Sequence, residues 1–176
     1  MRRLTIVLLL AGCGGAGPYG FAREYVPLDA EEQYLEAASA ISYEEVRRDP
    51  VDFQSTLVGW FGVVTDVEPR EDGTALVRMT YRTLSARNLC ADERDSSCRV
   101  TVSEREGGPF AAIVRLSPQE LSGDTRVWTG SLLKIYGEPT GELDPETGGP
   151  ILEAAFHRHW PHGKYVTTGA RAVMRR

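Results

Sequence analysis

A run of β-branched and aromatic residues extends from Thr56 to Val67 and contains two glycines, Gly59 and Gly62. Residues of this kind favour strands. Glycine inside a strand, by contrast, has no side chain to pack and suits a strand that bends sharply. In a small barrel one strand bends to serve two sides, whereas a flat sheet needs no such bend. The segment therefore favours a small β-barrel.

Further segments supply the other strands of such a barrel. Residues 74–84 alternate between polar and apolar side chains, which predicts a strand with one buried face. Other strand segments are predicted at 99–102, 110–116, 131–137 and 150–160. An immunoglobulin-like sandwich would need about seven evenly spaced strands and has no place for a helical turn inside the sheet.

Three capping signatures predict short helices, each with a capping residue three positions before a glutamate. They are Asp29 with Glu32, Ser42 with Glu45, and Ser117 with Glu120. The first two predict helices on the N-terminal side of the barrel, and the third predicts one helical turn in mid-sheet. The fold class is therefore mainly β: a small OB-like Greek-key barrel with N-terminal helices and one short helix between strands 3 and 4.

The first residues have the pattern of a secretory signal. Met1-Arg2-Arg3 is positive, residues 4–11 are apolar, and the apolar run is far shorter than the ~20 residues of a membrane-spanning helix. Leu10-Ala11-Gly12-Cys13 resembles the lipobox of bacterial lipoproteins, which are cleaved before the cysteine and then acylated on it. The resemblance implies an exported lipoprotein that is held to a membrane by lipid on Cys13. In the sorting rule known for enteric bacteria, Gly14 rather than Asp after the cysteine favours the outer membrane, and we expect its periplasmic face.

The chain then divides into four parts. Residues 1–12 are the expected signal peptide, 13–28 a flexible tether rich in glycine, 29–166 the barrel domain with its N-terminal helices, and 167–176 a basic tail. Removing Arg2 and Arg3 from the 20 basic residues leaves 18 against 25 acidic ones, a net charge of −7. Nucleic-acid binding depends on cationic contacts with phosphates, so no nucleic-acid partner is expected.

Two further cysteines, Cys90 and Cys98, flank a short polar loop. In an oxidising compartment an even pair of this kind predicts a disulfide bond. The alternative is two unpaired thiols. A zinc site is not expected here, because it needs more ligands than the loop contains.

All three histidines, His157, His159 and His162, lie within six residues. Positions two apart in a strand point to the same side, so His157 and His159 could bind one Zn or Cu ion, with His162 completing the site. The alternative is that they only cover the end of a barrel. We predict no cofactor and keep a histidine-based metal site as the alternative.

The large aromatic residues of the barrel region are expected to be mostly core, with one or two on a ligand surface for an envelope protein or a glycan. The candidates for that surface are Trp60, Tyr136 and Trp160. No Gly-x-Ser-x-Gly, Ser-x-x-Lys set, His-Glu-x-x-His or phosphate-binding glycine loop is present. We therefore predict that the chain is not an enzyme and acts as a binding or structural module.

The stretch from Tyr43 to Trp160 resembles the Slp family of outer-membrane lipoproteins. The resemblance depends on hydrophobic and glycine patterns in four segments: Tyr43-Glu-Glu-Val46 with Asp49-Pro50, residues 58–64, residues 130–141, and Pro150 to Trp160. It implies a lipoprotein of the cell envelope with an OB-like fold, and it implies no reaction.

Overall fold

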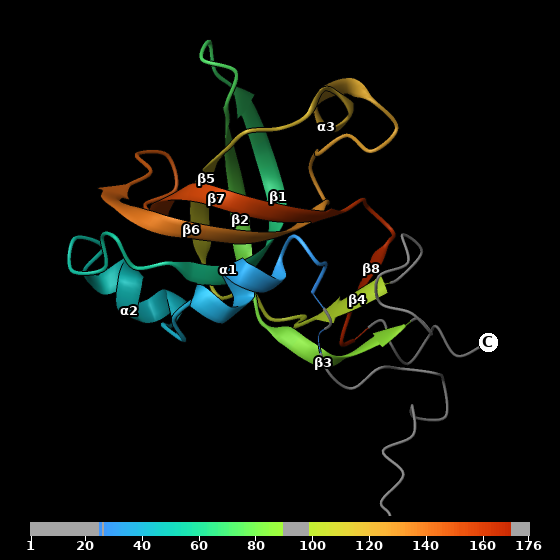
Figure 1. Ribbon diagram of the computed structural model, residues 1–176, viewed down its shortest axis with the longest axis horizontal. Coiled ribbons are helices and arrows are strands. Elements are labelled where there is room, and N and C mark those ends of the chain that lie inside the picture. The colour runs from blue at the N-terminus through green and yellow to red at the C-terminus, as the bar shows by residue number, and fades with distance from the viewer. Residues whose placement is uncertain (1–24, 26, 90–98, 170–176) are drawn as a thin grey trace, which may run out of the picture.

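Five strands form a closed barrel in the computed structural model, which describes residues 25, 27–89 and 99–169 (Figure 1). The strands are β1 (Val58–Pro69), β2 (Ala75–Arg82), β5 (Pro109–Val114), β6 (Leu132–Leu143) and β7 (Pro150–Trp160). Their order around the barrel is β1-β2-β5-β7-β6, with β6 paired back to β1. Among the strand pairs of the barrel, only β5 and β7 are parallel. This is the Greek-key order of an OB-like barrel and confirms the predicted fold class.

Three short helices accompany the barrel: α1 (Glu32–Ala37), α2 (Tyr43–Arg48) and α3 (Pro118–Ser122). The capping boxes predicted at Ser42 and Ser117 are both present, and α3 lies between the third and fourth barrel strands. The prediction that Asp29 caps the first helix was wrong. The N-cap of α1 is Glu31, which makes no side-chain cap bond because its carboxylate is buried against the barrel.

Gly62 shows how narrow the barrel is. A β-carbon at this position would lie 2.7 Å from the ring of Phe110 and 2.8 Å from Cβ of Met79. Both contacts are shorter than van der Waals distance, so a larger residue would push β1 away from β2 and β5. The glycine inside β1 is therefore needed for close packing across the barrel.

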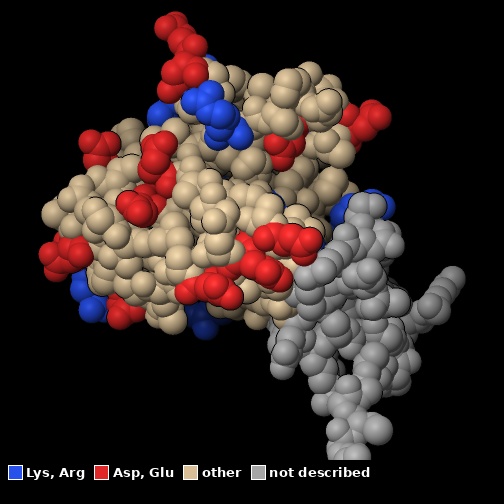
Figure 2. Space-filling view, viewed as in Figure 1, with Lys and Arg blue, Asp and Glu red and all other residues tan. Residues whose placement is uncertain are grey.

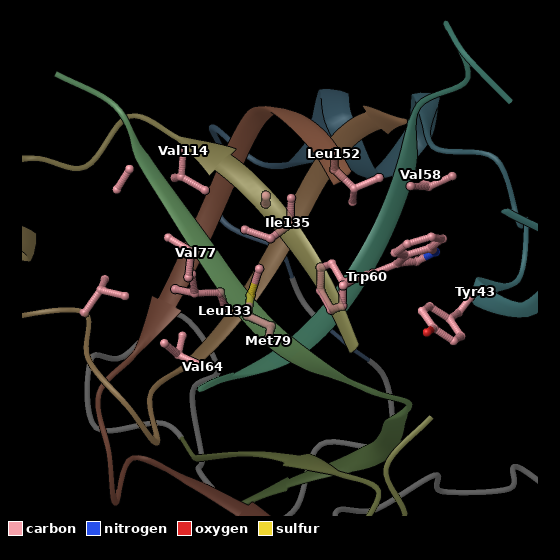
Figure 3. Packing of buried hydrophobic residues seen from close by; sticks show 14 of the residues in the cluster. Tyr43, Val58, Trp60, Val64, Val77, Met79, Val114, Leu133, Ile135 and Leu152 are labelled. Carbon is pink, nitrogen blue, oxygen red and sulfur yellow. The ribbon is translucent and has the colours of Figure 1, made fainter. Parts of the chain in front are cut away.

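The core fills the barrel with aliphatic and aromatic side chains from every barrel strand (Figure 3). Val77 and Met79 point inward from β2, as the alternation predicted. At one end, Trp60 packs edge-on against Tyr43 of α2, with ring centroids 5.8 Å apart. Helix α2 thus covers that end of the barrel.

The outer face of β2, which was predicted to be polar, is covered by other parts of the chain. Arg78 is only 8% exposed. Its guanidinium pairs with four carboxylates at 2.9–3.3 Å, those of Asp66, Glu68, Asp144 and Glu146. The β6–β7 connection, which contains Asp144 and Glu146, therefore folds back over β2.

A second, three-stranded sheet lies beside the barrel (Figure 1). It consists of β3 (Leu84–Leu89), β4 (Arg99–Val102) and β8 (Tyr165–Thr167), in the order β3-β4-β8. Its inner face packs on Phe61, Leu132 and Trp160, which point out of the barrel. β8 was not predicted, and it includes Thr167, which the sequence had assigned to the tail. Among the described residues, no helix is long and apolar enough to cross a membrane.

Candidate ligand-binding groove

The end of β7 places two histidines on one side of the barrel wall. In the β6–β7 ladder His157 is paired with Ile135 and His159 with Leu133. Ile135 and Leu133 belong to the barrel core, and residues directly opposite each other in a ladder share a face of the sheet. His157 and His159 therefore point to the same side, as their two-residue spacing predicted.

Helix α3 is joined to β7 through the carboxylate of Glu120. His157 Nε2 lies 2.8 Å from Glu120 Oε1. The other oxygen, Oε2, accepts hydrogen bonds from the backbone N–H of Ser117 at 2.9 Å and from its hydroxyl at 2.8 Å. Burial alone would raise the pKa of Glu120, but hydrogen bonds from His157 and Ser117 lower it to about 2. Both oxygens of an ionised carboxylate are thus used inside the protein.

His159 has no comparable partner. Its Nε2 is buried and makes no hydrogen bond to any residue that the structure describes. Burial lowers the pKa of His159 to about 4, with Glu120 opposing this shift and His157 adding to it. The imidazole is therefore neutral at pH 7, and its buried Nε2 is left without a hydrogen-bond partner among the described residues.

A cavity of about 690 Å³ lies between α3 and the end of β7, within the range typical of small-molecule sites. We call it the α3–β7 groove. Its polar lining comes from Ser117, Glu120, Thr125, His157, His159 and Lys164, and its apolar lining from Leu28, Trp160 and Pro161. Arg158 also lines it. The groove thus has two cationic lining residues, Arg158 and Lys164. The whole chain, by contrast, has a net charge of −5, and Asp and Glu predominate on the face shown in Figure 2.

One wall of the groove is held by a buried ionic network around Glu31, which is 0% exposed. Its carboxylate accepts hydrogen bonds from the backbone N–H of Leu28 at 3.1 Å, from Tyr136 at 2.8 Å and from Arg158 at 3.2 Å. Tyr25 donates a further bond at 2.5 Å. The network therefore fixes the segment before α1 against β6 and β7, and it places Leu28 in the groove.

Lys134 completes the charge balance of this network. Its ammonium lies 3.5 Å from Glu31 Oε1 and 3.9 Å from the ring centroid of Tyr25. Burial lowers the pKa of Lys134 to about 8, and the charge of Glu31 limits that shift. For Glu31, burial would raise the pKa, but hydrogen bonds from Tyr25 and Tyr136 hold it below its usual range. One buried anion is thus shared by Lys134 and Arg158.

Residues 13–28 were predicted to form a flexible tether. Tyr25, which the structure describes within this range, contacts the barrel. Tyr25 packs edge-on against Phe61, with ring centroids 5.8 Å apart, and its hydroxyl accepts from Arg158 at 3.0 Å. Tyr25 is therefore attached to the barrel.

The structure does not bring the three histidines together. His162 lies beside Trp128, with its Nδ1 3.4 Å from the carbonyl oxygen of Gly130. His157 is bonded to Glu120. Within residues 25, 27–89 and 99–169, no group of three or more His, Cys, Asp or Glu side chains is placed to hold a metal ion.

The three aromatic residues that were predicted to lie on an exposed ligand surface are buried. Trp60, Tyr136 and Trp160 are 3%, 0% and 5% exposed, because Trp60 points into the barrel and the other two pack under α1 and the small sheet. Trp160 is among the residues that line the groove. Trp128 is the exposed tryptophan, at 47%.

Sequence reasoning identified the histidines but missed the groups that complete the groove. Glu120 was recognised only as a capping residue, and Glu31 has the sequence pattern of a surface acid at the start of a helix. No sequence pattern indicated that Lys164 or Leu28 belongs to a ligand site. The cysteine predictions, Cys13 for lipidation and Cys90 with Cys98 for the disulfide, lie outside the described residues.

No protein-family model matches the chain, and no curated protein matches it.

Proposed function

We propose that the chain is a lipid-anchored lipoprotein of the bacterial envelope whose barrel is a non-enzymatic binding module, with the α3–β7 groove as its ligand site. The observation that carries the proposal is the cavity of about 690 Å³ that is lined by His159, a residue whose buried Nε2 has no hydrogen-bond partner among the described residues. Buried polar groups in proteins are almost always paired, so a cavity-lining residue that carries an unpaired one is a candidate for ligand contact.

The arrangement of polar groups favours binding over nucleophilic catalysis. A serine nucleophile needs a base within hydrogen-bond distance, and the base needs an orienting group. In the groove, the Ser117 hydroxyl donates to Glu120, and Glu120 is the group that contacts His157. Ser117 is therefore used to cap α3.

Anchoring through Cys13, export to the outer membrane and Slp-family membership are parts of the same proposal and are supported by the sequence. Tyr25, the first described residue, follows Cys13 by 12 positions. An extended chain of that length spans at most about 40 Å. A lipid on Cys13 would therefore hold the groove near the membrane surface.

Replacing Cys13 with Ser tests the anchor. We expect the variant to lose metabolic labelling by palmitate, whereas the wild-type protein is labelled. Labelling that persists in the variant would refute the lipoprotein assignment.

The ligand site is tested by filling the groove. Thr125 is exposed and lines the groove, so Thr125→Trp should block it without disturbing the core. The full mature chain carrying Cys13→Ser would be incubated with an envelope extract and analysed by native mass spectrometry. We expect a small molecule on this chain and on the matched control Thr65→Trp, at an exposed position of β1, but not on Thr125→Trp. Equal loading of all three would exclude the groove.

A further inference from the structure

The groove contains one cation that is unpaired within the described part of the chain. Glu120 Oε1 lies 2.8 Å from His157 Nε2, and Arg158 is paired with Glu31 at 3.2 Å. Lys164 is exposed and lines the same groove, and no ion pair among the described residues includes it. In this acidic protein, the ammonium of Lys164 is therefore the cationic group that an anionic ligand in the groove would contact.

His159 provides a second polar contact. Its Nε2 is unpartnered among the described residues, and a neutral imidazole can donate a hydrogen bond from this nitrogen. Leaving a buried donor unpaired is unfavourable. An oxygen atom of a ligand would remove that cost.

The groove also has an apolar part of its lining, formed by Leu28, Trp160 and Pro161. Leu28 is held in place by its backbone N–H bond to Glu31, while Trp160 and Pro161 continue from the end of β7. These side chains suit a hydrocarbon or aromatic group and offer nothing to a second charge.

From these features we infer that the α3–β7 groove binds a small amphipathic monocarboxylate, with its carboxylate between Lys164 and His159 and its apolar body against Leu28, Trp160 and Pro161. The inference rests on the proposed function, since it takes the groove to be the ligand site.

A carboxylate fits these groups better than a phosphate does. One unpaired ammonium and one imidazole nitrogen match two oxygens that carry a single charge. A guanidinium would suit a phosphate, because its fork binds two oxygens at once. Arg158, however, already donates to Glu31 and Tyr25.

Isothermal titration calorimetry with three probes tests the inference on the mature chain carrying Cys13→Ser. Octanoate has the charge and the apolar body, octan-1-ol has only the body, and inorganic phosphate has only charge. We expect octanoate to bind at least about tenfold more tightly than the other two, as one charge-assisted contact allows. His159→Phe and Lys164→Gln should each weaken octanoate about tenfold and leave octan-1-ol unchanged.

His162→Phe is the matched control, because His162 does not line the groove. Lys164→Gln changes an exposed residue, so it keeps the test valid if His159→Phe fails to fold. Octanoate affinity that equals that of octan-1-ol, or that survives both replacements, would overturn the inference and leave the groove a binding site of another kind. Octanoate binding that survives Thr125→Trp would overturn the proposed function as well. Absence of octanoate binding, or equal binding of phosphate, would also overturn the inference.

Discussion

Glu31 accepts a hydrogen bond from Arg158 at 3.2 Å, and this buried pair joins the segment before α1 to the last strand of the barrel. Because both side chains are at least 91% buried, neither charge can be solvated if the other is removed. The pair therefore controls whether the N-terminal segment stays attached to β7.

Glu31→Gln should lower the free energy of unfolding by about 3–5 kcal/mol, since it leaves Arg158 and Lys134 buried without their anion. Urea unfolding of the purified chain measures the loss. Glu36→Gln, at an exposed position of α1, is the control and should stay within about 0.5 kcal/mol of wild type. A loss for Glu31→Gln as small as the control's would show that the network contributes no stability.

The bond between His157 and Glu120 should stabilise the packing of α3 on β7. A double-mutant cycle with His157→Phe and Glu120→Ala is expected to give a coupling energy of about 1–2 kcal/mol at pH 7. The cycle cancels the separate loss of the Ser117 cap in Glu120→Ala. If the two single losses simply add, His157 and Glu120 do not interact in solution.

Stability should rise with pH between 4 and 6.5. Burial lowers the pKa of His159 to about 4 in the folded chain, from about 6.5 when unfolded, so in this window the unfolded state binds more protons. We expect about 2 kcal/mol to be lost on going from pH 6.5 to pH 4, with His159 partly exposed. Glu120, with a pKa of about 2, adds a loss below about pH 4.5.

Melting temperatures across this pH range check the prediction. His159→Phe should show a flatter profile between pH 4 and 6.5, whereas His162→Phe should keep the wild-type slope. An unchanged slope in His159→Phe would assign the pH dependence to other groups.

Cys90 and Cys98 should form a disulfide bond in exported protein. Their direct neighbours, Leu89 and Arg99, are Cα partners in the antiparallel β3–β4 pairing. Cα atoms of such partners lie about 4.5–5.5 Å apart, which is within the range found for residues joined by a disulfide. The bond should stabilise the fold by about 2–3 kcal/mol. Alkylation without reductant should leave both cysteines unlabelled, and two labelled thiols would contradict the prediction.

Zn²⁺ or Cu²⁺ should leave the melting temperature of the mature chain unchanged. His157 contacts Glu120, and His162 contacts Gly130 and does not line the groove. Bound metal would raise the melting temperature with ion concentration. A rise that disappears in the double variant His157→Phe, His159→Phe would establish the histidine-based metal site that we treat as the alternative.

Local chemistry in the sequence was sufficient for several elements. The capping boxes at Ser42 and Ser117 act within one helical turn, so residues three positions apart determine them. The bounds predicted for β7, residues 150–160, agree with the structure. Val77 and Met79 were correctly placed inside, because strand periodicity assigns alternate side chains to one face.

Tertiary structure alone decided the rest. Asp29 has the residue type of an N-cap, yet the helix begins after Glu31, since burying that carboxylate with Arg158, Lys134 and two tyrosines outweighs a local cap. β8 is three residues long and exists through its parallel pairing with β4, which lies more than 60 positions earlier in the chain. The groove likewise combines Leu28, Glu120 and His159, whose contacts depend on long-range chain closure that no local pattern records.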